Sequence, residues 1–327
     1  MQGKRRKTMS FNPILTRRHF VTATSAVVAG LAWRSTSWGA ENPATIKKAM
    51  IGKPTEETLK QLKAAGFHGI ESNDRHADLK DAQAARKLAE SLDMRIHSVL
   101  YGWANFNTDS VNSDIESVAR SLETAAAYGA DALLLVPCRI GGMPMPEAWE
   151  FDVEFDEKTG HVLRVVKGDN TPYKAYIEAH NHAIDTSKEA VKKLIPVAEK
   201  TKVVIALENV WNNLWVKPAI FAHFVKSFDH PMVQTYFDIG NHVKYAPPVE
   251  WIRALGKTIV KLHVKDFLLN PDGHGGKFVH PRDGSVDWPA VRAELEKIGY
   301  TGWMTIEDGG LSLEEFSQRL DLIIAGK

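Results

Sequence analysis

The sequence predicts an α/β protein, a (β/α)8 TIM barrel with an extended loop or β-hairpin insertion after its fourth strand. From about residue 45 onward, short apolar runs alternate with helix-like segments eight times, and this order predicts a parallel sheet wrapped by helices. Runs such as VVIAL (residues 203–207) are apolar throughout, which is typical of strands covered on both faces. The competing fold is a doubly wound open sheet. It is disfavoured because the first turn, MIGKPTEETL, lacks GxGxxG spacing.

The repeating units are located by apolar runs for strands and by longer amphipathic segments for helices. Strands are expected at residues 45–52, 68–72, 94–99, 132–137, 203–209, 233–238, 259–264 and 302–307. Helices are expected at residues 55–65, 77–91, 112–128, 173–201, 218–227, 249–255, 287–298 and 312–325.

One segment interrupts this rhythm between the fourth strand and the next helix. Residues 137–172 contain AWEFDVEFDEKTGHVLRVVKG, which predicts a β-hairpin with its turn near residues 158–160. Because it follows a barrel strand, the segment is expected on the active-site face. It is interpreted either as a lid or substrate wall, or as a packing or oligomer contact.

The first 39 residues have the outline of a targeting segment. A basic start containing Arg17 and Arg18 precedes an apolar stretch at residues 20–32 and then small residues before Ala40. The paired arginines resemble a twin-arginine export signal, and the apolar stretch is too short to span a membrane. We therefore expect a periplasmic or secreted protein without stable membrane association after export. The alternative is an uncleaved disordered or amphipathic N-terminus.

The composition is that of an ordinary globular protein with a sizeable core. The chain has 327 residues, 44% of them hydrophobic and 25% charged, with a net charge of +1. Residues 40–327 are expected to form the single barrel domain, and the near-neutral charge predicts no nucleic-acid partner. Cys138 is the single cysteine, which excludes an intrachain disulfide and a thiolate metal site. The 13 histidines leave a nitrogen and oxygen metal site open.

Four of the predicted strands end on residues that ligate metals. Glu208, Asp238, His263 and Glu307 end the segments VIALE, QTYFD, IVKLH and WMTIE. A single strand-end glutamate is more often a simple solvent contact. In a barrel, however, all four side chains would meet at one rim. Three carboxylates there would repel one another unless a cation neutralised them, so the pattern predicts a site for Mn²⁺, Mg²⁺, Co²⁺ or Zn²⁺.

The same segments resemble a known family, the xylose isomerase-like sugar phosphate isomerase and epimerase barrels, which include ketose 3-epimerases and apurinic endonucleases. The resemblance runs from about residue 45 to the C-terminus. It rests on LEN (207–209), FDIGN (237–241), LHVKD (262–266) and GSVDWPAVRAELEKIGYTGWMTIE (284–307). It implies that the four strand-end residues are metal ligands, and that Glu208 and Glu307 are the pair that move protons.

This resemblance implies a metal-dependent sugar isomerase or epimerase that works through an enediolate, with the two glutamates as acid and base. An exported member is expected to act on an unphosphorylated sugar. The first alternative is a lyase or hydratase that removes an α-proton from a 3-keto-glycoside and eliminates a leaving group. The second is a non-catalytic sugar-binding barrel. A nuclease is disfavoured by the near-neutral charge, and homo-oligomer formation is left open.

Further residues near the strand ends are candidates for substrate binding. Many relatives have a histidine three residues after the strand-six aspartate. Here that position is Asn241, and a histidine follows one residue later. Lys265 has the side-chain parity of His263, and tryptophans in the loops are candidates for stacking on a sugar ring, with Trp215 as one of them. Asp266 is expected behind a ligand. The substrate-binding candidates are His97, Lys265, His242, Glu71, Trp103, Trp211 and Asn241.

Overall fold

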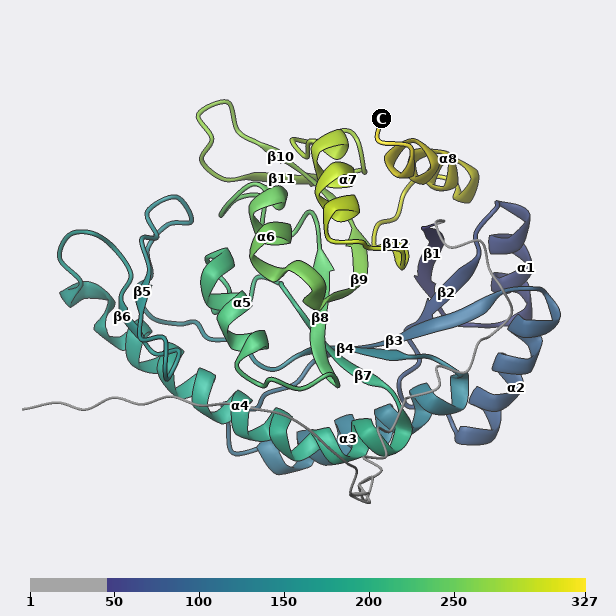
Figure 1. Cartoon of the computed structure of the whole chain (residues 1–327), viewed down its shortest axis with the longest axis horizontal. Coiled ribbons are helices and arrows are strands. Elements are labelled where there is room, and N and C mark those ends of the chain that lie inside the picture. The colour runs from purple at the N-terminus through teal and green to yellow at the C-terminus, as the bar shows by residue number, and fades with distance from the viewer. Residues whose placement is uncertain (1–45) are drawn as a thin grey trace, which may run out of the picture. The chain divides into compact units, whose positions relative to one another are not determined.

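The computed structural model describes residues 46–327 and shows a closed barrel of eight parallel strands with helices between them (Figure 1). Neighbouring strands follow the order β1-β12-β9-β8-β7-β4-β3-β2, and β1 pairs with both β12 and β2 to close the ring. The predicted (β/α)8 fold is therefore confirmed. The expected export signal lies outside the described residues. The barrel strands are β1 (Lys47–Gly52), β2 (Gly69–Ser72), β3 (Arg95–Trp103), β4 (Ala132–Val136), β7 (Val204–Glu208), β8 (Val233–Asp238), β9 (Ile259–Val264) and β12 (Trp303–Ile306).

The helices surround the strands and cover them with apolar faces. In α5, for example, the buried residues include Ile220, Phe221 and Phe224, which is the pattern of a helix packed on a sheet. None of the described helices is both long and apolar enough to cross a bilayer. The helices are α1 (Glu56–Ala64), α2 (Leu79–Ser91), α3 (Val111–Tyr128), α4 (Lys174–Thr201), α5 (Pro218–Lys226), α6 (Pro248–Leu255), α7 (Trp288–Lys297) and α8 (Leu313–Ile324), with 3₁₀ turns η1 (Thr171–Tyr173) and η2 (Gly256–Thr258).

Side-chain caps explain where several helices begin. The side chains of Thr55, Asp78, Asp287 and Ser312 each accept a hydrogen bond from a backbone N–H in the first turn of α1, α2, α7 and α8. Such caps satisfy N–H groups that have no partner inside the helix. They fix the residue at which each of these four helices begins.

Two short antiparallel pairs of strands lie outside the barrel. β5 (Glu154–Phe155) and β6 (Val162–Arg164) lie between β4 and α4, where the Asp156 side chain accepts hydrogen bonds from the N–H groups of Lys158 and Thr159. The second pair, β10 (Asp266–Leu269) and β11 (Gly276–Val279), directly follows β9 and was not expected. Gly276 has φ +148°, and a Cβ atom there would lie 2.1 Å from the Leu268 carbonyl oxygen. The second hairpin therefore needs glycine at this position.

The third strand extends further than predicted. It was expected to end at Val99, but β3 continues to Trp103, with Gly102 at φ +80° near its end. The C-terminal end of this strand is therefore four residues later in the sequence than expected. His97 consequently lies well inside the barrel rather than at its mouth.

Candidate metal centre

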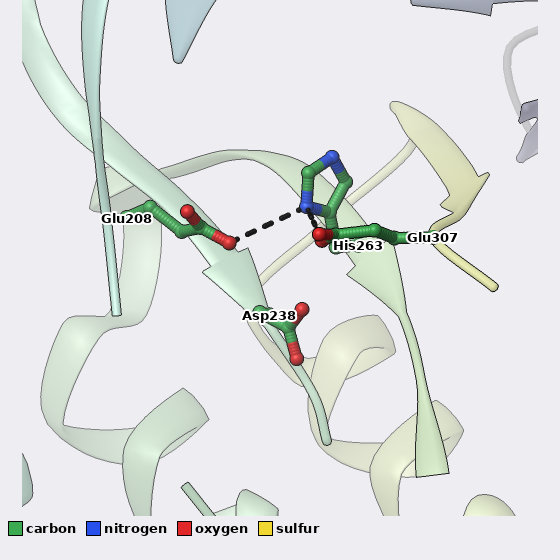
Figure 2. A group of neighbouring side chains, drawn as sticks. All are labelled: Glu208, Asp238, His263 and Glu307. Carbon is green, nitrogen blue, oxygen red and sulfur yellow. Dashed lines mark ion pairs between the residues drawn. The ribbon is translucent and has the colours of Figure 1, made fainter. Parts of the chain in front are cut away.

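Glu208, Asp238, His263 and Glu307 meet at the C-terminal rim of the barrel (Figure 2). One ligand atom from each side chain lies within 4.8 Å of the others. Glu208 and Asp238 are the last residues of β7 and β8, His263 is the penultimate residue of β9, and Glu307 follows β12. Parallel pairing places Asp238 directly beside His263. The register of the strands therefore gathers residues that are far apart in the sequence.

Backbone hydrogen bonds hold Asp238 in one orientation. Its Oδ1 accepts from the N–H groups of Gly240 at 2.8 Å and Asn241 at 2.7 Å. Asn209 clamps the same residue, because its Oδ1 accepts from the Asp238 N–H and its Nδ2 donates to the Asp238 carbonyl, both at 2.7 Å. With Oδ1 used in this way, Oδ2 is the oxygen left for a ligand.

The two ring nitrogens of His263 face different partners. Nδ1 lies 2.6 Å from Glu307 Oε2 and 3.5 Å from Glu208 Oε1, on the side of the cluster. Nε2 lies 2.6 Å from Glu71 Oε2, on the opposite side of the ring. A proton on Nε2 that is donated to Glu71 leaves the Nδ1 lone pair free, which is the tautomer that a metal ligand needs.

The surroundings move the pKa values of the cluster in opposite directions. Burial raises the pKa of Glu208 to about 7, and repulsion from Glu307 adds to the shift. Burial also raises the pKa of Glu307, but His263 and Lys265 outweigh it and bring that pKa to about 2. Burial lowers the pKa of His263, whereas the carboxylates of Glu71 and Glu307 outweigh it and raise the pKa well above the ordinary value. The negative charge of the carboxylates therefore favours a positive charge within the cluster.

The donor set fits a divalent cation. Within residues 46–327, Asp238 Oδ2, His263 Nδ1 and Glu307 Oε2 are buried and make no hydrogen bond of normal geometry; their close neighbours are ion-pair contacts, Nδ1 to Oε2 at 2.6 Å and the Lys265 Nζ to Oδ2 at 3.4 Å. Buried polar atoms are normally paired, so such a gap requires an explanation. Three carboxylates and one imidazole nitrogen, facing one another at this spacing, would be satisfied together by an ion that prefers oxygen and nitrogen ligands.

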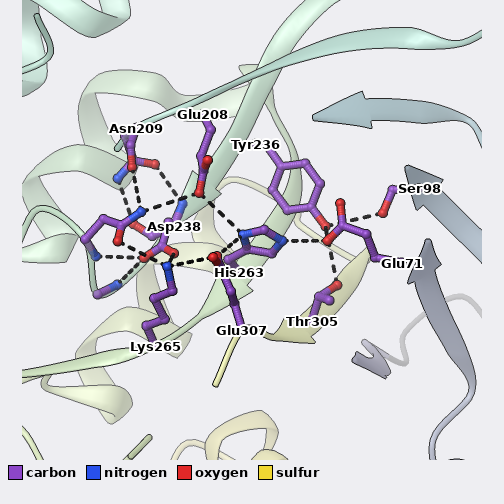
Figure 3. A network of polar contacts seen from close by, with 12 residues as sticks. Glu71, Ser98, Glu208, Asn209, Tyr236, Asp238, His263, Lys265, Thr305 and Glu307 are labelled. Atoms are coloured by element: carbon purple, nitrogen blue, oxygen red, sulfur yellow. Dashed lines mark hydrogen bonds and ion pairs between the residues drawn. The ribbon is translucent and has the colours of Figure 1, made fainter. Parts of the chain in front are cut away.

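Lys265 also lies at the cluster (Figure 3), and Asn241 lies beside it. The Lys265 Nζ is 2.9 Å from Glu307 Oε1 and 3.4 Å from Asp238 Oδ2, and it donates to Asn241 Oδ1 at 3.4 Å. The Asn241 Nδ2 donates to Glu208 Oε1 at 3.4 Å. Both residues were expected to bind substrate, and the structure places their polar atoms beside the four candidate ligands.

Two other expected pocket residues lie beneath the cluster, inside the barrel. Glu71 is fully buried and is bonded to His263 and to the Tyr236 hydroxyl. His97 is stacked on Trp303, the first residue of β12, at 4.4 Å, and its Nε2 is 3.1 Å from Thr305 Oγ1. Because β3 continues well beyond His97, this residue lies deeper in the barrel than expected, and substrate binding by His97 stays a prediction. Glu71 contacts a candidate ligand instead of an open pocket.

The remaining candidates lie away from the four ligands. His242 is buried, its Nδ1 accepts from the Asn209 Nδ2 at 3.2 Å, and its ring packs on Trp251. Trp215 is fully buried among phenylalanines of α5. Trp103 is 42% exposed at the end of β3, with the Arg139 guanidinium 5.2 Å from its ring centroid. These positions leave Trp103 at the rim and place the other two in the core.

Asp266 has a bracing function that was not expected. Its carboxylate accepts from the backbone N–H groups of Phe267, Arg282, Gly284 and Val286 and from the Trp288 indole. These bonds tie the end of β9 to the loop before α7. Asp266 thus anchors the loop and does not contact the four candidate ligands through any of these bonds.

Tyr236, Thr305 and Asn209 are site residues that sequence reasoning missed. Tyr236 and Thr305 lie two residues before Asp238 and Glu307, so that the alternation of a strand points them to the same inner face. The Tyr236 hydroxyl donates to Glu71 Oε2 at 3.0 Å, which joins these strands to the support of His263. The two-residue spacing from Asp238 and Glu307 was the signal in the sequence that could have identified Tyr236 and Thr305. Asn209 gave no signal of its own beyond following Glu208.

Comparison with solved structures shows the same fold at low identity. The 3-keto-D-glucoside 4-epimerase of E. coli is 13% identical, with 86% of this chain and 100% of that chain covered and a TM-score of 0.60. Mannonate dehydratase from Streptococcus suis is 15% identical, with 87% and 95% covered and a TM-score of 0.62. A xylose isomerase-like TIM barrel protein from Mycobacterium smegmatis in complex with magnesium is 18% identical, with 86% and 96% covered and a TM-score of 0.58.

No curated protein matches the sequence. A family model does, and it spans residues 59–321, from α1 to α8. This range contains all four residues of the candidate metal centre. The chain therefore belongs to the family of xylose isomerase-like TIM barrels.

Proposed function

We propose that the protein is a metal-dependent sugar isomerase or epimerase. The observation that carries the proposal is the convergence of Glu208, Asp238, His263 and Glu307 within 4.8 Å at the C-terminal rim. Active sites of such barrels lie on this face. Family membership and the similarity to a sugar epimerase and to a magnesium-bound barrel support the same reading.

The four side chains would hold one divalent cation, with His263 contributing Nδ1 and Asp238 contributing Oδ2. When bound, a cation of this kind supplies Lewis-acid stabilisation of negative charge on neighbouring substrate oxygens. The ligand set accommodates Mn²⁺, Mg²⁺, Co²⁺ or Zn²⁺. Fixed orientation of Asp238 by Asn209 and of His263 by Glu71 keeps the donor atoms in place.

Glu208 and Glu307 are the candidate proton carriers. They come from β7 and from the end of β12, and Figure 2 shows them on two sides of the cluster. A sugar bound between them would present its acidified C–H to one carboxylate, and the other would return a proton to the opposite face of the enediolate. That sequence gives epimerisation. Return of the proton to the adjacent carbon gives aldose–ketose isomerisation.

Lys265 and Asn241 are suited to bind the polar groups of the substrate. The Lys265 ammonium group lies between Glu307 and Asp238 and can stabilise an oxyanion that develops beside them. The Asn241 amide nitrogen, next to Glu208, can donate to a sugar oxygen. We propose an unphosphorylated sugar, because the N-terminal sequence resembles an export signal and phosphorylated sugars are mainly cytoplasmic intermediates.

Elimination is the second candidate reaction. A mannonate dehydratase shares the fold, and the Lys265 Nζ is 2.9 Å from Glu307 Oε1, so that a proton donor stands beside a candidate base. Here a glutamate would remove the α-proton of a keto-glycoside. The oxygen of the departing aglycone would take a proton from a donor such as Lys265. The same enolate chemistry therefore leads to a different product.

Deuterium exchange tests the proposal directly. The purified protein with Mn²⁺ is incubated in D₂O with free ketoses and 3-keto-glycosides, and NMR follows deuterium at the carbons next to the carbonyl group. We expect uptake that is lost in both Glu208→Gln and Glu307→Gln and retained in Glu178→Gln, an exposed glutamate of α4. An epimer or isomer as product supports the first reaction, and a released aglycone supports elimination. Sugar binding without exchange would show a binding barrel instead.

A further inference from the structure

An exposed aromatic side chain lies beside the candidate metal centre. Phe278 on β11 is 45% exposed, although a phenylalanine normally buries its ring. It pairs across the hairpin with Phe267, whose ring is buried and lies 5.2 Å away, edge to face. Figure 1 shows this hairpin, β10 and β11, next to β9 and α7. Phe278 therefore rests on a fixed apolar base with part of its surface uncovered.

The position of Phe278 relative to the cluster follows from Lys265. The Lys265 Nζ is 5.7 Å from the centroid of the Phe278 ring and 2.9 Å from Glu307 Oε1. The ring can therefore be no farther from that carboxylate than these two distances together. If a sugar binds at the cluster, a substituent attached to that sugar would lie within reach of Phe278.

Trp211 packs against Phe278, and its own ring and N–H group already have partners within the protein. Its ring lies 5.0 Å from Phe278, and the Lys244 Nζ lies 3.5 Å from its centroid. Its indole N–H donates to the Asn241 carbonyl. These contacts leave Phe278, rather than the expected Trp211, as the aromatic surface open to a ligand.

A second aromatic contact braces the hairpin from across the rim. Trp149, which follows β4, is stacked on His274 in the β10–β11 turn, with centroids 4.4 Å apart and planes at 19°. In the barrel, β7 and β8 lie between β4 and β9. The contact therefore spans the strands that carry Glu208 and Asp238, and it limits how far the hairpin can move from the cluster.

We propose that Phe278 forms an outer subsite for a second ring, joined to the sugar that binds at the cluster. This inference rests on the proposed function and narrows the substrate class to glycosides. A flat ring, either an aromatic aglycone or another pyranose, would pack on the exposed part of the Phe278 ring. The polar groups at the cluster would hold the first sugar. One stacked ring strengthens binding by up to about tenfold.

Calorimetry with three β-glucosides tests the subsite. We would titrate the protein containing Mn²⁺ with methyl glucoside, 4-nitrophenyl glucoside and cellobiose. We expect the aryl glucoside to bind about tenfold more tightly than the methyl glucoside. Cellobiose binding as tightly would identify any flat ring as the ligand, whereas a preference limited to the aryl group would identify an aromatic aglycone.

Variants locate the effect. Phe278→Ala is expected to abolish the preference for the aryl glucoside over the methyl glucoside, and Phe278→Tyr should retain it. Leu79→Ala is the matched control, because Leu79 on α2 is also 45% exposed. Equal binding of the three glucosides, no binding of any of them, or a preference that survives in Phe278→Ala would overturn the subsite. A preference without deuterium exchange would refute the isomerase and keep the subsite.

Discussion

Glu71 Oε2 lies 2.6 Å from His263 Nε2, and both side chains are fully buried inside the barrel. The Tyr236 hydroxyl donates to the same carboxylate oxygen (Figure 3). Carboxylates behind ligating histidines fix the ring orientation and raise the basicity of the other nitrogen. We therefore propose that Glu71 is a positioning residue, which would prepare His263 Nδ1 for a cation without contacting the substrate.

Replacing Glu71 by Gln should weaken metal binding by about 10- to 100-fold. The amide keeps the size of the side chain but loses the charge that holds the Nε2 proton. Competition with a fluorescent chelator measures the affinity for Mn²⁺ independently of activity. The matched control is Ser98→Ala, because Ser98 is a buried neighbour whose hydroxyl lies 3.4 Å from the Tyr236 hydroxyl. Unchanged affinity in a folded Glu71→Gln protein would show that Glu71 has only a structural function.

Metal addition should stabilise the protein against heat. An ion that binds only the folded state contributes about 2.7 kcal/mol at 100 times its dissociation constant, which raises Tm by several degrees. Asp238→Asn should remove most of this shift, because Asp238 Oδ2 is one of the free ligand atoms. Differential scanning calorimetry with Mn²⁺ and with EDTA measures the shift. Asp185→Asn, an exposed aspartate of α4, should respond like the unchanged protein. A full shift in Asp238→Asn would refute its place in the site.

The four strand-end residues could be predicted because their signal is local. The strands 233–238 and 259–264 were located without error, since each is a short segment rich in apolar and β-branched residues with a candidate ligand at or next to its end. Once a barrel is inferred, its geometry brings Asp238 and His263 to one rim whatever the details of packing. Strand parity likewise indicated that Lys265 points toward the site, where it now lies 2.9 Å from Glu307.

Contacts across the barrel interior could not be predicted in this way. Glu71 on β2 reaches His263 on β9 only through the closure of the ring, and a local pattern contains no information about which inward side chains meet. The β10–β11 hairpin was missed because its glycines and its turn resemble an irregular loop. Its one signal was the pair of phenylalanines, Phe267 and Phe278, whose contact depends on the strand register.

Asn209→Ala should destabilise the protein by about 2–6 kcal/mol. The side chain is buried and makes two 2.7 Å hydrogen bonds to the backbone of Asp238, which join the ends of β7 and β8. Loss of the amide leaves a buried N–H and a buried C=O without these partners, each at a cost of about 1–3 kcal/mol. Urea unfolding measures the change. Asn107→Ala, which loses one exposed bond to the Arg139 carbonyl, should cost much less. Equal effects of the two would contradict the clamp.

The opposite end of the barrel contains a buried lysine whose partner is half exposed. The Lys261 Nζ lies 2.6 Å from Asp131 Oδ1, with side chains 5% and 47% exposed. Removing one member of a buried pair costs more than replacing the charged group by an apolar one. We therefore expect Asp131→Asn to destabilise the protein by about 1–3 kcal/mol, discounted for the exposure of Asp131, and Lys261→Met to cost less. Urea unfolding at pH 7 compares the two variants.

The pH dependence of Asp131→Asn follows from the same pair. Burial lowers the pKa of Lys261, and Asp131 opposes that shift, so that the variant should lower the pKa further. A lysine with a folded-state pKa below its unfolded value of about 10.4 binds fewer protons when folded, and stability then rises with pH between the two values. The deficit of Asp131→Asn relative to the unchanged protein should therefore shrink from about pH 7 to about pH 9.5. A deficit that stays constant, or that grows with pH, would show that Lys261 is not the group left unpaired.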